Sequence, residues 1–322
     1  MNMGNVLIFA LTNALLYVLH PRLVWRYVRY IRRAPNIAKP LRYSERMLWR
    51  KIVDHNPAFI VFSDKLAARE YARRTCPDMA LPEILWTGDD ADGIPDELLR
   101  GGVLVKANHG SSFNRHIRAG QPVDRAELKA TTERWLRTVY GTAKGEWTYA
   151  KVTPRLFVEK AVGDSRGDLI ELQVRAGNGK AIAGSVTGHT KTPDQWSVYL
   201  DTLGNPTLRA NDKPGDHITP LPEGIHILRP FRQAIRHAEA LSVGVDYARF
   251  DFLWNGTELY GGEITVFPAS GSREFMNATM HDIVMAGWDL TQSNFLKTPH
   301  AGLTRIYAAA LCDSINRRAN PP

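Results

Sequence analysis

The sequence is poor in cysteine, with only Cys76 and Cys312 among 322 residues. The two lie far apart, and no CxxC or Cys/His spacing accompanies them, which excludes a disulfide framework and a structural zinc site. We therefore expect a protein of a reducing, cytoplasmic compartment. The chain also lacks internal repeats and low-complexity tracts. Its content of 44% hydrophobic and 23% charged residues is typical of a folded globular protein.

Long apolar runs are scarce as well. The run at residues 6–19, VLIFALTNALLYVL, is interrupted by Thr12 and Asn13 and is shorter than the roughly 20 residues that cross a bilayer. It has no basic start and no small-residue cleavage site. We therefore expect neither a membrane-spanning helix nor a secretory signal peptide.

Positive charge is in excess, with a formal net charge of +8 and a pI near 9.5, so anionic partners are favoured. No DNA- or RNA-binding motif is present, and we expect no nucleic-acid partner. Arg22, Arg26, Arg29 and Arg33 form a stripe at helical spacing. This stripe is either the solvated face of a helix that packs on the body or an interfacial helix at the inner face of an anionic membrane, where each basic residue contributes roughly 1 kcal/mol.

Helical and strand-like segments alternate along the rest of the chain and predict one α+β body with mixed or antiparallel sheets. Ser63 is the expected N-cap of a helix, and Asp124 with Glu127 forms a capping-box pattern for another. Gly141 suits the C′ position of that second helix. Asn178–Gly179 predicts a tight hairpin turn.

The stretch VLVKANHGSSFN at residues 103–114 carries the first candidate site. Strand alternation places Lys106 at the end of a strand, beside a loop in which Gly110 and Ser111 leave backbone N–H groups free to face an anion. The lysine precedes the glycine, so the loop is not a Walker motif. A phosphate cradle is one interpretation. A solvated lysine before an ordinary surface loop is the other.

Asp251 and Glu263 are the second candidate site. A two-residue turn at Asn255–Gly256 would place the two carboxylates on opposite faces of the hairpin, whereas a three-residue loop that includes Thr257 would place them on one face, one diagonal step apart. Buried together, they would need neutralisation, which Mg²⁺ bound to phosphate oxygens supplies. The alternative is a pair of solvated carboxylates on an exposed hairpin.

Three further positions complete the candidate set. Arg249 shares the face of Asp251 and forms either a structural ion pair or a bidentate contact to a phosphoryl or carboxylate group. Glu159 and Lys160 close the strand RLFVEK and precede AVGDSRGD, a crossing between lobes. The alternative for this pair is an exposed strand end.

Taken in order, these residues resemble the ATP-grasp superfamily, and within it the branch similar to the teichuronopeptide biosynthesis protein TupA. The resemblance covers roughly residues 40–271. It is carried by the stretches SDKLAAREYA, VLVKANHGSSFN, GEWTYAKVTPRLFVEK, NGK and RFDFLWNGTELYGGEITVFPASG.

The resemblance implies two α+β lobes that hold ATP and Mg²⁺ in a cleft between them, with a helical N-terminal extension. Each candidate residue takes a role from it. The phosphates of ATP would be contacted by Lys65, Lys106, His109, Gly110 and Ser111, and the base and ribose by Glu159 and Lys160. Mg²⁺ would be held by Asp251, Glu263 and Thr265. The transferring phosphoryl group would be stabilised by Arg249 together with Lys106.

The implied segments are 1–39, a helical and membrane-surface segment; 40–100, the first part of the body; 101–158, the small lobe with the phosphate loop; 159–300, the lobe with the metal site; and 301–322, a tail. The sequence departs from the family pattern at three positions. Ser112 replaces a loop glycine, Gln173 replaces a basic residue, and Thr265 stands where many ATP-grasp enzymes have asparagine.

The implied reaction is ATP-dependent formation of an amide from a carboxylate and an amine through an acyl-phosphate. Its substrate would be a carboxylate- or amine-bearing glycan or glycan precursor of cell-surface polysaccharide biosynthesis. Two alternatives remain, a glycosyltransferase that uses a nucleotide sugar and an ATP-binding protein without turnover. The sequence contains no compact DxD motif, which disfavours the glycosyltransferase.

Overall fold

The computed structural model describes residues 3–163, 169–190, 192–207, 221–275 and 278–319. The helices are α1 (Met3–Leu19), α2 (Pro21–Ile31), α3 (Tyr43–Ile52), α4 (Ala58–Ser63), α5 (Lys65–Thr75), α6 (Arg125–Arg137), α7 (Leu228–Leu241), α8 (Ala278–Gly287), α9 (Asn294–Lys297) and α10 (Gly302–Ala319). The strands are β1 (Ile84–Gly88), β2 (Val103–Ala107), β3 (Asn114–Ile117), β4 (Leu156–Lys160), β5 (Ile170–Gly177), β6 (Lys180–Gly188), β7 (Trp196–Leu200), β8 (Ala248–Trp254) and β9 (Leu259–Thr265).

The smaller sheet has the strand order β1-β4-β2-β3, and every neighbouring pair is antiparallel. One of its faces is apolar and packs on α6, where Leu128 and Trp135 meet Val105 and Val158. Its other face carries Lys106 and Glu159. Because β1 belongs to this sheet, the small lobe takes a strand from the segment expected to be the first part of the body.

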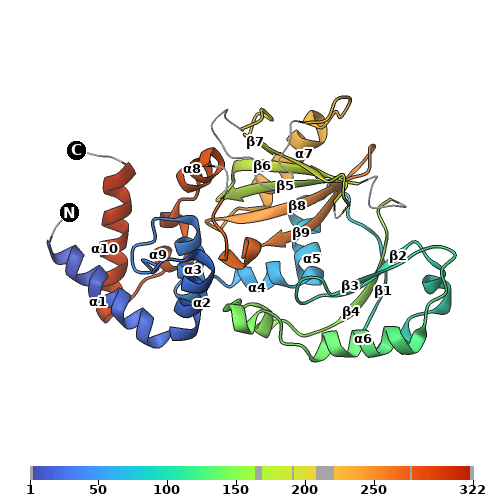
Figure 1. The fold of residues 1–322 in the computed structure, drawn as a ribbon, viewed down its shortest axis with the longest axis horizontal. Helices are drawn as coiled ribbons and strands as arrows, with labels where there is room; N and C mark the ends of the chain where they lie inside the picture. The colour runs from blue at the N-terminus through green and yellow to red at the C-terminus, as the bar shows by residue number, and fades with distance from the viewer. Residues whose placement is uncertain (1–2, 164–168, 191, 208–220, 276–277, 320–322) are drawn as a thin grey trace.

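The larger sheet has the order β7-β6-β5-β8-β9 and is also antiparallel throughout. Alternation along β5 and β8 turns side chains such as Leu172 and Phe250 toward α7 and α5, where they are buried. The same alternation turns Glu171, Gln173 and Asp251 toward the opposite face. The two sheets of the α+β fold are visible in Figure 1, with α7 behind the larger one.

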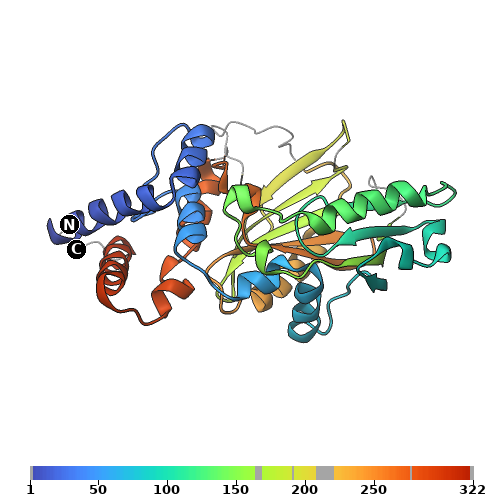
Figure 2. The same cartoon turned by 90° about the horizontal axis from the view of Figure 1, so that it is seen from below.

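The remaining helices gather at one end of the larger sheet (Figure 1). Residues of α3, α8 and α10 share one core there, which includes Trp49, Met280 and Tyr307. The helices α1 and α10 lie side by side, in both Figure 1 and Figure 2, and Asn5 Nδ2 donates to Asp313 Oδ2 over 2.8 Å. Residues 301–322, expected to be a tail, thus contain an 18-residue helix.

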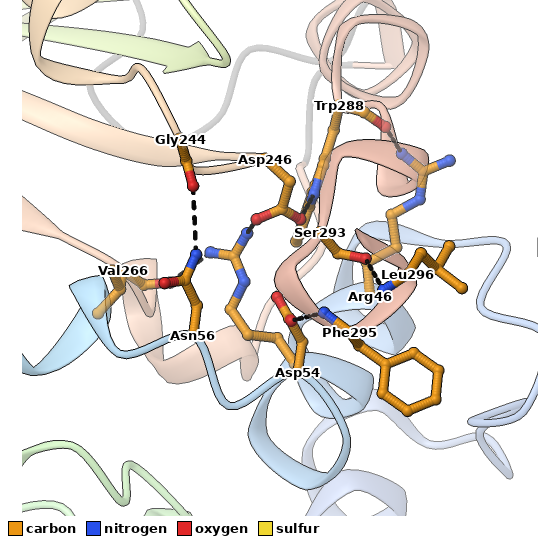
Figure 3. A network of polar contacts seen from close by, with 11 residues as sticks. Arg46, Asp54, Asn56, Gly244, Asp246, Val266, Trp288, Ser293, Phe295 and Leu296 are labelled. Atoms are coloured by element: carbon orange, nitrogen blue, oxygen red, sulfur yellow. Dashed lines mark hydrogen bonds and ion pairs between the residues drawn. The ribbon is translucent and has the colours of Figure 1, made fainter. Parts of the chain in front are cut away.

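A buried ion pair joins this helical end to the larger sheet (Figure 3). Arg50 of α3 donates to Asp246 Oδ1 over 2.7 Å and to the carbonyl of Val266 over 2.9 Å. Trp288 Nε1 donates to the other oxygen of Asp246 over 2.6 Å. Both charged side chains are fully buried, and the guanidinium lies between the rings of Phe59 and Trp288. The pair therefore links three distant parts of the chain.

Asp54, also drawn in Figure 3, makes stability depend on pH. Burial, reinforced by the nearby charge of Asp246, raises the pKa of Asp54 to about 7, although Arg50 opposes the shift. The folded state thus keeps a proton that the unfolded chain loses near pH 4. The free energy of unfolding should therefore fall as pH rises from 4 to 7.

We expect wild-type protein to lose about 2 kcal/mol more stability between pH 5 and pH 8 than Asp54→Asn, at roughly 1.4 kcal/mol per pKa unit. Asparagine retains an oxygen to accept the 2.8 Å hydrogen bond from the Phe295 N–H. Urea unfolding at the two pH values measures the difference. Parallel pH profiles for both proteins would refute the assignment.

Several local predictions are confirmed and others need correction. Asn178 and Gly179, with φ of 47° and 78°, form the predicted two-residue turn between β5 and β6. The N-cap of α5 is Asp64 instead of Ser63, because Ser63 ends α4 and the Asp64 carboxylate accepts from two backbone N–H groups. α6 is capped by Asp124 as expected but ends at Arg137, so Gly141 is not its C′ residue.

Candidate active site

The β8–β9 hairpin places the two candidate metal carboxylates on one face, although not by the expected loop. The connection is four residues long, with Trp254 opposite Leu259, and this register alone would separate the carboxylates. A β-bulge between Phe250 and Phe252 then shifts the register by one residue. One added residue turns the side chains beyond it to the opposite face of the sheet, so Asp251 and Glu263 point to the same face.

Arg249 and Thr265 join the same cluster. The Arg249 guanidinium donates to both oxygens of Asp251, over 2.7 and 2.6 Å, and to Thr265 Oγ1 over 3.3 Å. Thr265 Oγ1 in turn donates to Glu263 Oε1 over 3.4 Å. Burial raises the pKa of Asp251 to about 6; Arg249 counteracts this, and the charges of Glu263 and Glu171 add to it.

Lys106 and Glu159 form an ion pair across β2 and β4, on the face of the smaller sheet that looks toward this cluster. Arg69 of α5 approaches the second oxygen of Glu159 at 3.6 Å. Lys160, next along β4, is exposed, and its side chain lies on the other face of the strand. The structure therefore brings Glu159 to the cleft but leaves the Lys160 side chain outside it.

The loop after β2 is held by Asn108, which is buried. Its side chain donates to Asp64 Oδ1 over 3.0 Å and to the Thr153 carbonyl over 3.1 Å, and its oxygen accepts from the Arg155 N–H over 2.8 Å. Its backbone carbonyl accepts from the Lys65 N–H over 2.9 Å. Asn108 was not predicted as a site residue, although it follows directly after the strand in KANHGSS.

His109 does not point into the cleft. Its Nε2 lies 3.1 Å and 3.2 Å from the carbonyls of Trp135 and Thr138, at the C-terminal end of α6, and the ring is buried. Burial lowers the pKa of His109, so the neutral imidazole donates to these carbonyls. The side chain fixes the loop on α6, so it is not placed to make the predicted phosphate contact.

Gly110 and Ser111 lie where the sequence predicts, along the wall of the cleft. Gly110 has φ of 98°, and a Cβ there would lie 2.8 Å from the Tyr140 ring. Its carbonyl accepts from the Lys65 ammonium. Ser112 has φ of 66°, a left-handed conformation that glycine adopts at less cost, so the glycine of the loop pattern that the sequence resembles would suit this backbone.

A continuous cleft runs between the two sheets. Its inner chamber, of about 200 Å³, lies beside Ala161 and Leu253. The middle chamber, of about 220 Å³, lies between Lys106 and Asp251. The outer chamber, of about 470 Å³, extends beyond Glu263. The cation of Lys106 and the acidic pair therefore converge on one cleft, as the sequence interpretation requires.

Two charged residues of the middle chamber were not predicted. Glu171 on β5 lines both the inner and the middle chamber. Side-chain alternation in IELQVRAG puts Glu171 on the same face as Gln173. That this face lines the cleft follows only from the register that pairs Gln173 with Asp251. Arg69 lines the middle chamber, and its pKa is lowered by burial while Glu159 opposes the shift.

The donor set fits Mg²⁺. Asp251, Glu263 and Thr265 offer only oxygen atoms, which this ion prefers, and two carboxylates are the number it takes when phosphates supply the rest. Burial is the main cause of the raised pKa of Asp251, and the charge of Glu263 adds to it. Arg249 donates to both oxygens of Asp251, so a cation that binds Asp251 would compete with the guanidinium for them.

Many solved structures are similar to this chain. D-alanine–D-alanine ligase from Bacillus anthracis, complexed with ATP, matches with 14% identity and a TM-score of 0.41 over 80% of this chain and 67% of that one. The ATP-grasp ligase PsnB, complexed with its minimal precursor, matches with 13% identity and a TM-score of 0.36 over 84% and 67%. No curated protein matches the sequence.

The family model described as TupA-like ATPgrasp matches residues 45–286, about three quarters of the chain. The match includes both sheets and every candidate residue of the cleft. It leaves out α1, α2, α9 and α10. The chain therefore belongs to the TupA-like ATP-grasp family.

Proposed function

We propose that the protein is an ATP- and Mg²⁺-dependent carboxylate–amine ligase of cell-surface polysaccharide biosynthesis. The observation that carries the proposal is the convergence of Lys65 and Lys106 with Asp251 and Glu263 on one cleft between two sheets. Family membership supports ATP as the nucleotide. The polysaccharide role rests on the likeness to the TupA branch.

ATP would bind with its base in the inner chamber and its phosphates in the middle chamber. Leu253 offers an apolar surface for the base, and the Glu171 carboxylate can accept hydrogen bonds from ribose hydroxyls. Lys106 and Lys65 supply positive charge for the phosphates. Burial, with Lys106 adding to it, lowers the pKa of Lys65, as expected for an ammonium that lacks a full counter-charge.

Asp251, Glu263 and Thr265 would hold Mg²⁺. When bound, this ion neutralises charge on the β- and γ-phosphates. The protein's own part is positioning and electrostatic stabilisation. Arg249, freed from one oxygen of Asp251, would donate to the transferring phosphoryl group.

The proposed reaction has two steps. A substrate carboxylate oxygen attacks the γ-phosphorus, the bond to the β-phosphate oxygen breaks, and ADP leaves. An amine then attacks the acyl carbon, phosphate leaves with the bond electrons, and the nitrogen loses a proton. The outer chamber, which adjoins Glu263 and Arg249, is the place for both substrates.

Substitution of Lys106 tests the nucleotide site. We expect Lys106→Gln to weaken binding of Mg·ADP at least tenfold, because the phosphates lose a charge-assisted contact and Glu159 keeps only Arg69 as a counter-charge. Calorimetric titration measures the affinity. Lys180→Gln, an exposed lysine at the start of β6, should bind like wild type.

The same titration separates the candidate functions. Preference for a UDP-sugar over adenine nucleotides would favour a glycosyltransferase and contradict the ligase. Release of ADP and phosphate from Mg·ATP in the presence of a carboxylate and an amine substrate would distinguish a ligase from a silent ATP-binding protein. Equal affinity of the wild-type and Lys106→Gln proteins would show that nucleotide binds elsewhere.

We also propose that α1 docks on an anionic membrane surface. Its exposed apolar residues are Met3, Val6, Leu7, Leu11, Leu15, Val18 and Leu19. The helix carries no charged side chain, whereas α2, which follows it, is rich in arginine. Apolar insertion beside basic charge is the pattern of an interfacial helix.

No single helix within the described ranges has the length and composition of a membrane span; α1 and α2 reach it only as a pair, which is bent by 100°. Arg22, Arg26 and Arg29 lie on α2, while Arg33 lies beyond its end. Tyr27 of α2 is buried against the body, so this helix also fits the packing interpretation.

Vesicle flotation tests the membrane proposal. With vesicles of phosphatidylglycerol and phosphatidylcholine, we expect the triple variant Leu7→Gln, Leu11→Gln and Leu15→Gln to lose at least tenfold in partitioning, since each exposed leucine buries apolar surface. Leu203→Gln, an equally exposed leucine outside α1, is the matched control. If flotation were unchanged in the triple variant, α1 would not be the membrane contact. If wild type formed a dimer that the triple variant lost, the exposed face of α1 would instead bind a second copy of the chain.

A further inference from the structure

We propose that the outer chamber binds a substrate that carries a second anionic group, carboxylate or phosphate, in addition to the carboxylate that is activated. This inference rests on the proposed ligase function and specifies the class of its substrate. The second group would be recognised by Arg26, Lys144 and Arg273. The three side chains come from distant parts of the chain and line the same chamber.

The position of the outer chamber assigns it to the substrate. It adjoins the middle chamber at Lys65, Gly262 and Glu263, on the far side of the carboxylates from Lys106. A nucleotide in the inner and middle chambers would therefore present its terminal phosphate to the outer one. A volume of about 470 Å³ is in the usual range for a small-molecule site.

Three of the cations in this chamber have no ion-pair partner among the described residues. Within the part of the chain that the structure describes, no carboxylate lies within 4 Å of Arg26, Lys144 or Arg273. Arg26 lies over the Tyr30 ring at 4.7 Å, and Lys144 lies 5.0 Å from the centre of the Tyr140 ring. Arg249 and Lys65, by contrast, are already engaged by Asp251 and the Gly110 carbonyl.

Glu146 and Glu263 are the acidic residues that line the outer chamber. Glu263 lies at the proposed metal site, where the ion would neutralise it. Glu146 is buried at the base of the chamber, beside Lys51. Neither cancels the three cations, so the chamber attracts negative charge.

The chamber wall is held in a strained conformation. Ala269, Ser270 and Gly271 have φ of 48°, 54° and 59°, and left-handed backbone at the two residues that are not glycine costs of order 1 kcal/mol each. Lys51, which is buried, maintains it by donating to the Ser270 carbonyl over 2.8 Å, to Ser270 Oγ over 3.0 Å and to the Lys144 carbonyl over 2.7 Å.

One wall of the chamber comes from outside the matched family region. Arg26 and Tyr30 belong to α2, whereas the family model begins at residue 45. The N-terminal extension therefore contributes a cation and an aromatic ring to the site. The other two cations, Lys144 and Arg273, lie inside the matched region.

Calorimetric titration of the full chain with small anions tests the proposal. The probes are acetate, with one charge, and succinate and inorganic phosphate, which are dianions near pH 8. With the protein saturated in Mg·ADP, we expect at least one dianion to bind tenfold or more tighter than acetate. The preferred dianion distinguishes a second carboxylate from a phosphate group.

Charge-removing variants locate the site. Arg26→Gln, Lys144→Gln and Arg273→Gln should each weaken dianion binding about three- to fivefold, as expected for partly exposed charges, and leave the affinity for Mg·ADP unchanged. Arg134→Gln, an exposed arginine on α6, controls for net charge.

The outcomes are distinct. Equal binding of acetate and both dianions, or dianion binding that the three substitutions do not change, would overturn the anionic subsite. Failure of Mg·ADP to bind would instead overturn the proposed function. The anion titrations would then be carried out without nucleotide, and they would still test the anionic subsite. Thermal unfolding of each variant shows whether the fold is retained.

Discussion

Asp246→Ala is expected to lower the free energy of unfolding by about 3–5 kcal/mol, which is the effect of leaving one partner of a buried ion pair without its counter-charge. Arg50 would remain fully buried, and Trp288 Nε1 would lose its acceptor. Urea unfolding followed by tryptophan fluorescence and by circular dichroism measures the change.

The matched control is Glu70→Ala, which removes a carboxylate from an exposed ion pair with Arg73 on α5. Such pairs contribute roughly 0–1 kcal/mol. If both variants lost the same small amount, the Arg50–Asp246 pair would not be the link between α3 and the larger sheet. The double variant Arg50→Met with Asp246→Leu should recover part of the loss, because it removes both charges.

Glu263→Gln should abolish most of the effect of Mg²⁺ on nucleotide binding. In wild type, we expect Mg²⁺ to strengthen binding of ADP, since the ion would bridge the phosphates to Asp251 and Glu263. The amide is a weaker ligand without charge, so the strengthening should fall about tenfold or more. Titration of ADP in the presence of Mg²⁺ and of EDTA gives the ratio for each protein.

Glu258→Gln is the appropriate comparison. It removes the same charge from the loop of the same hairpin, outside the cleft. Its Mg²⁺ dependence should match wild type. An Mg²⁺ effect that survives in Glu263→Gln and in Asp251→Asn would mean that the ion binds away from β8 and β9.

The sequence was most informative where local rules decide the structure. The strand that carries Lys106 and the Asn178–Gly179 turn follow from alternation and turn chemistry, and both are present, although the strand extends one residue further, to Ala107. The placement of Asp251 and Glu263 on one face was predicted for the wrong reason. The loop is longer than expected, and a bulge, which no sequence pattern revealed, corrects the register.

Contacts between distant segments could not be predicted. From the sequence, Lys51 is indistinguishable from the other basic residues of its helix. Only the fold shows that it is buried and donates to residues 144 and 270. The same holds for Arg26, whose approach to the cleft depends on how α2 packs on α3. His109 was assigned to phosphate from the resemblance, but α6 offers it carbonyl acceptors that the local sequence does not show.

The three hydrogen bonds of Lys51 fix the wall of the outer chamber before a ligand binds. Because the side chain is anchored during folding, the backbone at 269–271 and the segment at 142–144 are already fixed in the ligand-free chain. A ligand that enters between them has no wall to order, and the entropy loss on association is correspondingly smaller. Preorganisation of this kind favours selectivity for one shape over adaptability to many.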